Sequence, residues 1–222
     1  MIFRTLTLLL TAAVLNSLSG HSVQAQITLT PTQHCHDFSA DAIVSFADPD
    51  LEAVVRDALE IGPQESLSCG KAASLETLIV GTSIERVVYG GTLRPSPEKP
   101  FESLAGLQNL SNLTRLNLIN RLVTDITPVG ELSKLKNLNL HTNWFSDISA
   151  LSRLTDLEQL IISENPISDI SPLAGLTKLR QLHVHGLYPY QLQHYLDYND
   201  GRDPDVVFNG ITDISPLANL TE

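Results

Sequence analysis

The feature that most constrains the fold of this 222-residue chain is a 22-residue spacing of leucines between residues 110 and 182. Three positions of each unit recur at this spacing: Leu110, Leu132, Leu154 and Leu176; Leu113, Leu135, Leu157 and Leu179; Leu116, Leu138, Leu160 and Leu182. A fixed period of this size is typical of repeat architectures, in which one unit cannot bury its own apolar face. We therefore expect stacked units that share one continuous core.

Each unit predicts one strand and one helical turn. Apolar residues alternate at the pairs Leu116/Leu118, Leu138/Leu140, Leu160/Ile162 and Leu182/Val184, which is the period of a strand with one buried face. Later apolar positions recur at three-residue steps, which favours a 3₁₀ turn on the opposite wall. Ser171 before Pro172 is typical of a helix start capped by serine. The predicted fold is an α/β leucine-rich repeat solenoid, a horseshoe or rod with one short parallel strand per turn.

Asparagine occupies the position where the chain leaves the strand in two of the units. The side-chain amides of Asn143 and Asn165 both donate and accept hydrogen bonds, so they can satisfy main-chain groups inside the bend. Arg121 and Leu187 stand at the equivalent positions of the first and fourth units. We expect those two bends to be less regular.

The units end in a DIxPLxxL segment, present as residues 169–176 and 213–220 with related copies from Asp125 and Asp147. In this segment the chain resembles internalin-type bacterial leucine-rich repeat proteins, over about half of its length. The stretch 46–53, FADPDLEA, is similar to the helical cap that precedes such repeats, so the resemblance implies an N-terminal cap. It implies a fold and not a ligand. The aspartates can stabilise bends through main-chain amides, or bind calcium, for which one carboxylate per turn is too few.

Residues 1–25 have the pattern of a signal peptide: Arg4, a short apolar run and small residues before the predicted cleavage after Ala25. The alternative is an uncleaved membrane anchor, although the run is short for a bilayer span, and no later stretch is long enough. We expect secretion to the extracellular space, cell surface or periplasm. Cleavage changes the formal charge from −11 to −12, since Arg4 is lost. This acidity disfavours nucleic acid and anionic membranes as partners.

Residues 26–100 are expected to form an N-terminal arm, the cap and an irregular first turn. A helix is predicted over residues 51–59 with Asp48 or Asp50 as its cap and Leu51, Val54, Val55, Ala58 and Leu59 on its apolar face. A second helix is predicted over residues 71–80, a first strand over 87–89, and a proline-rich loop over 94–100.

Two cysteines precede the repeats. Cys35 and Cys69 are expected to form a disulfide if the chain is secreted. The string His34 to Asp37 has the residue types of a metal site, but no second ligand cluster accompanies it. A third hypothesis for the function is a hydrolase with its nucleophile at Cys35.

Residues 101–222 are assigned to the repeats, with a degenerate unit at 187–208 that holds most of the tyrosines. This unit either fills a widened turn or forms an aromatic contact patch, whose members are Tyr188, Tyr190, Tyr195 and Tyr198. The sequence stops inside a repeat without a polar cap, from which we expect a longer protein.

The strand residues that alternate with the buried ones predict a binding surface on the concave side. They are Arg115, Asn117, Asn137, Asn139, His141, Gln159, Ile161, Gln181, His183 and His185, with Trp144 at the rim. This polar, nearly uncharged surface suits a protein or glycan partner. His183 and His185 share one face, and His141 lies two strands away, about 10 Å by the strand spacing, which is too far for the three to hold one metal ion. We expect neither cofactor nor catalysis, since the chain lacks the common catalytic motifs. The alternative function is a structural spacer in a larger surface protein.

Overall fold

The computed structural model describes residues 26–81, 99–184, 211 and 213–219, together with the backbone of 86–89 and 92–95. Several predictions lie outside the described residues. They are the signal peptide at 1–25, His185, Leu187, and the unit at 187–208 with Tyr188, Tyr190, Tyr195 and Tyr198.

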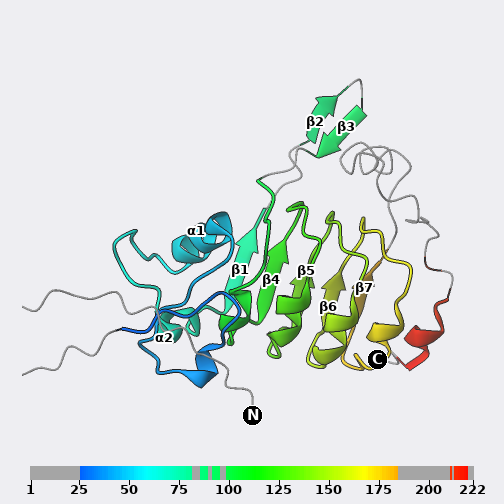
Figure 1. Cartoon of the computed structure of the whole chain (residues 1–222). Coiled ribbons are helices and arrows are strands. Elements are labelled where there is room, and N and C mark those ends of the chain that lie inside the picture. The colour runs from blue at the N-terminus through cyan, green and yellow to red at the C-terminus, as the bar shows by residue number, and fades with distance from the viewer. Residues whose placement is uncertain are drawn as a thin grey trace, which may run out of the picture.

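One strand from each turn joins a single parallel sheet, which confirms the predicted leucine-rich repeat solenoid (Figure 1). Its order is β1-β4-β5-β6-β7, with the bounds Thr77–Val80, Arg115–Leu118, Asn137–Asn139, Gln159–Ile161 and Gln181–His183. Leu116, Leu138, Leu160 and Leu182 pair in register across neighbouring strands. The register step is therefore the 22-residue period of the sequence.

Short 3₁₀ helices form the wall opposite the sheet (Figure 1). They are η2 (Leu107–Asn109), η3 (Thr127–Glu131), η4 (Ser149–Arg153), η5 (Ser171–Leu173) and η6 (Ser215–Asn219). The neighbouring helices η3 and η4 approach closely at Gly130, where an added Cβ would lie 2.7 Å from the main-chain oxygen of Ala150. Leucines of the inner turns fill the space between sheet and helices, and most are 0–1% exposed.

An aspartate holds the start of four of these 3₁₀ helices. One carboxylate oxygen of Asp125, Asp147, Asp169 and Asp213 accepts a hydrogen bond of 2.8 Å from the main-chain N–H two residues later. This confirms that the aspartate column stabilises bends. The prediction that Ser171 is a cap is wrong, because Ser171 is the first residue of η5 and donates its N–H to Asp169.

The bend after β5 is organised by Asn143, as predicted. Its Nδ2 donates to the carbonyls of Leu118 (2.7 Å) and Leu140 (3.0 Å), and its Oδ1 accepts from the N–H groups of Arg121 and Val123. Asn165 repeats the donor half one turn later, toward the carbonyls of Leu140 and Ile162. A single asparagine therefore links its own turn to the preceding one.

The bend at Arg121 is less regular, also as predicted. Two residues here, Asn120 and Leu122, have positive φ, whereas the next two bends each have one, at Thr142 and Glu164. Arg121 is buried and its guanidinium lies 5.4 Å from the centre of the Phe101 ring. Burial lowers the pKa of Arg121.

The cap packs against the β1 end of the sheet through α1 (Pro49–Ala58) (Figure 1). Asp48 caps this helix by accepting from the N–H groups of Asp50 and Leu51, and its second oxygen accepts from the N–H of Glu102 at 2.6 Å. Leu51 and Val55 are fully buried, but Ala58 is exposed, contrary to the predicted apolar face. Gly106, with φ +111°, allows the cap to approach, since a Cβ there would lie 2.6 Å from the Phe46 ring.

The predicted helix over residues 71–80 is wrong. Helix α2 covers only Cys69–Ala72, and Thr77–Val80 is the first strand of the sheet, paired with Arg115–Leu118. Exposed and buried residues alternate along this strand, and the partner strand completes its main-chain hydrogen bonds. Residues 77–80 are therefore a strand and not part of a helix, because they pair with strand β4 of the first full repeat.

The predicted first strand at residues 87–89 is also misplaced. Residues Arg86–Tyr89 form β2, which pairs antiparallel with β3 (Thr92–Pro95) in a separate two-stranded sheet (Figure 1). Two glycines separate these strands in the sequence, a composition that favours a tight hairpin turn over a return to the solenoid. This insertion explains why β1 and β4 are not spaced by 22 residues.

The predicted disulfide between Cys35 and Cys69 is present, with a Cα–Cα distance of 5.5 Å. It ties η1 (Cys35–Asp37) to α2. The buried amides of Gln108 and Asn109 fasten the same arm: they donate to the carbonyls of Pro31 and Gln33, and Asn109 accepts from the N–H of Cys35. In the described ranges no group of three or more metal-ligating side chains comes together.

Candidate binding face

Apart from Trp144, the predicted face residues that the structure describes lie together on the sheet, in three rows across the strands. The first row is Arg115, Asn137, Gln159 and Gln181; the second is Ile79, Asn117, Asn139, Ile161 and His183; the third begins where the strands end and contains His141 and Ser163. Because successive side chains of a strand point to opposite sides, these residues alternate with leucines, isoleucines and valines of the core side, which are buried in β1 and β4 to β6 and half-buried in β7. We call this surface the strand face.

Side chains of the first row bond to one another across the strands. Asn137 Nδ2 donates to Gln159 Oε1 at 3.0 Å, and Gln159 Nε2 donates to Gln181 Oε1 at 2.7 Å. Gln181 Nε2 lies 2.9 Å from Nε2 of His183. These four side chains are referred to as the amide ladder. The 22-residue register places one amide on each successive strand, which is why the ladder can form.

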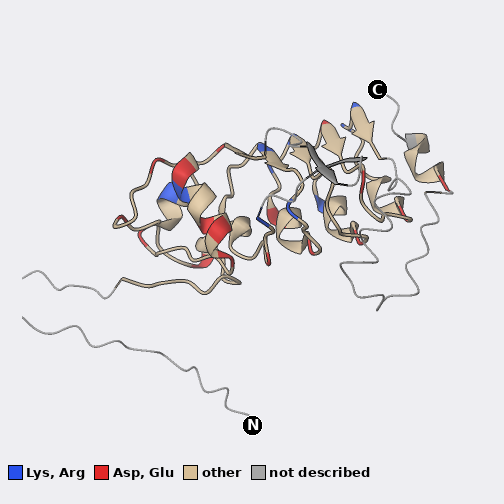
Figure 2. Ribbon diagram, turned by 90° about the horizontal axis from the view of Figure 1, so that it is seen from above, with Lys and Arg blue, Asp and Glu red and all other residues tan. Residues whose placement is uncertain are grey.

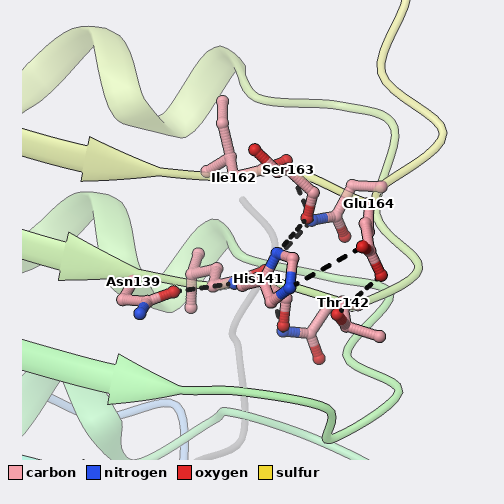
Figure 3. A network of polar contacts seen from close by, with 9 residues as sticks. Asn139, His141, Thr142, Ile162, Ser163 and Glu164 are labelled. Atoms are coloured by element: carbon pink, nitrogen blue, oxygen red, sulfur yellow. Dashed lines mark hydrogen bonds and ion pairs between the residues drawn. The ribbon is translucent and has the colours of Figure 1, made fainter. Parts of the chain in front are cut away.

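A second polar network lies at the carboxyl ends of β5 and β6 (Figure 3). His141 Nδ1 lies 3.1 Å from the main-chain oxygen of Ser163, and its Nε2 lies 3.9 Å from Oε1 of Glu164. Thr142 Oγ1 donates to the other carboxylate oxygen of Glu164 at 3.1 Å. A carbonyl can only accept, so Nδ1 of His141 carries a proton. The imidazole is thereby fixed in orientation between two turns.

Charge is sparse on the strand face and abundant on the cap. Figure 2 shows Asp and Glu gathered around α1, whereas the strands carry few charged residues. Residues 26–81 contain nine acidic and two basic residues, against eight and seven in residues 101–184. On the face itself Arg115 is exposed, and Glu164 is engaged by Thr142 and His141. The face is thus a nearly neutral area on an acidic protein.

The structure adds residues to the face that the sequence analysis missed. Thr77 and Ile79 belong to it through β1, and Ile79 is 47% exposed. The alternation of exposed and buried residues in 77–80 was the available signal, but so short a run fits a helix equally well. Glu164 and Thr142 were also missed, since their contact depends on positive φ angles of 59° and 56°. Trp144 is half-buried just beyond the bend, and its main-chain N–H donates to the carbonyl of Val123.

A pocket of about 290 Å³ lies away from the strand face, beside the disulfide. His34, His36 and Phe38 line it together with Gln108 and Asn109, whose amides already hold the N-terminal arm. Its polar lining is therefore part of the contacts that close the cap. No helix in the described ranges has the length and apolar composition to cross a bilayer.

No protein-family model matches the chain, and comparison with curated proteins finds no match. Among solved structures, an internalin from Listeria monocytogenes is 32% identical over 79% of this chain and 41% of its own, with a TM-score of 0.58. An internalin C2 from the same organism is 26% identical over 79% and 91% of the two chains, with a TM-score of 0.37. A leucine-rich repeat protein from Leptospira interrogans is 21% identical over 53% and 27%, with a TM-score of 0.42.

The sheet with one parallel strand per 22-residue turn defines a leucine-rich repeat protein. The likeness to the first Listeria structure extends beyond the repeats, since it covers 79% of this chain. The protein is internalin-like. It spans 41% of that internalin, so the activity of a whole internalin does not transfer to it directly.

Proposed function

We propose that this protein is exported and binds a protein or glycan partner through the strand face, without catalysing a reaction. The observation that carries the proposal is the amide ladder, a row of uncharged donors and acceptors held in place across three neighbouring strands. Side chains that are already ordered lose less conformational entropy when a partner binds. A polar surface of this kind recognises its partner by matched hydrogen bonds rather than by charge.

The dimensions of the face agree with a binding role. Five strands at a spacing of about 4.8 Å span about 19 Å, which suits a single domain or a short glycan. Exposed Ile79 and half-buried Ile161 add apolar contact area to the polar rows. Interfaces commonly combine such apolar contacts with about one hydrogen bond per 100–200 Å².

Export is supported by the predicted signal peptide at residues 1–25 and by the disulfide, which persists in oxidising compartments. A binding role without catalysis is supported by the fold, since the candidate residues lie along one face of a single sheet, whereas catalytic sites are usually enclosed pockets.

The test replaces Asn137, Gln159 and Gln181 by alanine together. A matched control replaces Lys134, Lys178 and Arg153, three exposed residues outside the strand face. Each protein is immobilised after circular dichroism has verified its fold, and is then exposed to a panel of extracellular proteins and to a glycan array. Loss of a ligand from the face variant alone supports recognition. Equal binding by all three proteins contradicts it.

A structural spacer is the second candidate, favoured by ion pairs that join successive turns. Lys178 pairs with Asp156 at 2.5 Å, Lys136 with Glu158 at 3.8 Å, and Arg153 with Glu131. The Lys178 hydrogen bond lowers the pKa of Asp156. For a spacer, the control triple variant would change the bending stiffness measured by small-angle scattering, and the face variant would change nothing.

A further inference from the structure

The amide ladder has a direction, and an imidazole sets it. Each amide donates its N–H group to the next oxygen in the order Asn137, Gln159, Gln181, and the last N–H reaches Nε2 of His183. An amide nitrogen carries only donors, so the ring nitrogen it approaches must be an acceptor. The ladder in this direction therefore requires an unprotonated Nε2 on His183.

Protonation of His183 removes that acceptor. Both ring nitrogens of the imidazolium are donors, and Gln181 then meets it with its own N–H group. The mismatch is relieved if Gln181 rotates its amide by half a turn and presents Oε1. Its Nε2 then faces Gln159, which must rotate in turn, and Asn137 follows. Nitrogen and oxygen exchange places at each amide, and the rest of each side chain keeps its position.

Few charged groups face His183. Strand β6 packs against β7 and presents Gln159 and Ile161, neither of which titrates. Elsewhere on the described strand face, the charged or titratable side chains are Arg115, His141 and Glu164. His185 follows on the same chain segment but lies outside the described residues. Arg115 neighbours Asn137 in register and can only donate, so it favours the direction that leaves Asn137 Oδ1 free to accept.

We propose that proton uptake at His183 reverses the amide ladder and so changes which groups of a partner the strand face can pair. Histidine is the side chain that ordinarily changes charge between about pH 5 and 8. A partner matched to one direction would leave polar groups unpaired against the other, which weakens binding. The consequence for binding rests on the proposed function, whereas the reversal itself is a property of the free protein.

The test is a pH titration of the free, full-length, ¹⁵N-labelled protein followed by NMR. We expect the side-chain amide resonances of Asn137, Gln159 and Gln181 to shift together, with the midpoint given by the ring protons of His183. His183→Gln keeps a hydrogen-bonding amide at that position but does not titrate, so the common shift is lost. His36→Gln removes an exposed imidazole from the cap and serves as the matched control, which retains the shift.

Gln159→Leu provides an independent variant because it interrupts the ladder without touching His183. In this protein Gln181 should still respond to His183, whereas the response of Asn137 should be lost. The proposal is overturned if Asn137 and Gln159 do not respond in the wild-type chain, or if Asn137 still responds in Gln159→Leu. Because no partner is present, failure here leaves the binding experiment above unaffected, and the reverse also holds.

Discussion

The repeats and the cap are held together by different kinds of contact. In the repeats one contact is copied 22 residues later, as with Asn143 and Asn165, each of which donates to a carbonyl of its own turn and to one of the preceding turn. In the cap each contact occurs once: the Cys35–Cys69 disulfide, the Asp48 carboxylate and the Asn109 amide. The comparison teaches that such a repeat contact links two turns, while each cap contact fastens a single place, either within the cap or between the cap and the first repeat.

The largest expected effect tests the first half of this comparison. Asn143→Ala should lower the free energy of unfolding by on the order of 4 kcal/mol, because four buried main-chain groups in two turns lose a partner at about 1–3 kcal/mol each. Urea denaturation measures the change. Asn137→Ala is the control and should stay within about 1 kcal/mol, since this side chain is half-exposed. Similar losses in both variants would mean that the bend is not shared between turns.

Removal of the disulfide tests the part of the comparison that concerns the cap. Cys35→Ser with Cys69→Ser should cost about 2–4 kcal/mol, because the unfolded chain regains the freedom of a loop between residues 34 apart. Hydrogen exchange should show the loss in residues 26–75, with protection in β5 and β6 retained. Uniform loss of protection along the chain would show that the cap and the repeats unfold together.

Asp48 joins helix α1 to the first repeat by a single side chain. Asp48→Ala should cost about 2 kcal/mol, since one buried carboxylate caps the helix and also accepts from the N–H of Glu102. Asp50→Ala, which loses only an exposed contact with Lys99, is the control. Thermal unfolding compares the two, and an equal change in Tm would exclude a special role for Asp48.

A gain in stability is expected at a strained position of the repeats. Thr142 has φ +56°, a conformation that is unfavourable for a β-branched residue and common for asparagine. Thr142→Asn should stabilise the fold by about 0.5 kcal/mol, after the loss of the hydrogen bond to Glu164 is subtracted. Thr177→Asn, at a position without positive φ, should bring no gain. Destabilisation of Thr142→Asn would show that the network in Figure 3 outweighs the strain.

The smallest expected effect is on the loss of folding stability at acidic pH. The N–H of Ser149 lowers the pKa of Asp147 in the repeats, and Lys71 lowers that of Glu65 in the cap, chiefly by side-chain hydrogen bonding. A carboxyl with a lowered folded pKa stabilises the fold above its unfolded pKa, and this stability is lost as pH falls through the folded value. Asp147→Asn and Glu65→Gln should each lose less stability than the wild type between about pH 4 and 2. Denaturation at several pH values measures the free energy of unfolding of both variants. If it falls with pH as steeply as in the wild type, the prediction is contradicted.

The repeats could be predicted from the sequence because their contacts are local and copied. Strand registers, bends at Asn143 and the disulfide all agree with the expectation. Residues 71–80 were predicted as a helix because a short apolar run fits both periods, and only the partner strand β4 decides between them. Residues 87–89, Val-Val-Tyr, were predicted to be the first strand of the solenoid. Their true partner, at residues 92–95, follows a turn that the 22-residue count could not include.

The strand face was also partly predictable. Alternation placed Asn137, Gln159 and Gln181 on one side, since side chains of a strand point alternately to its two faces. It did not predict that these amides bond to one another, or that His141 reaches a carboxylate on the next turn. Those contacts depend on rotamers and on left-handed residues at the bends.

By itself, the sequence determined that this chain is a solenoid with a leucine core and one strand per turn, because periodic burial admits no other packing of the units. Tertiary structure alone decided where the first strand lies, how the cap is closed and which polar atoms meet on the strand face. Those outcomes depend on groups that are distant in the chain, such as Asp48 and Glu102, and no local pattern specifies which distant group becomes the partner.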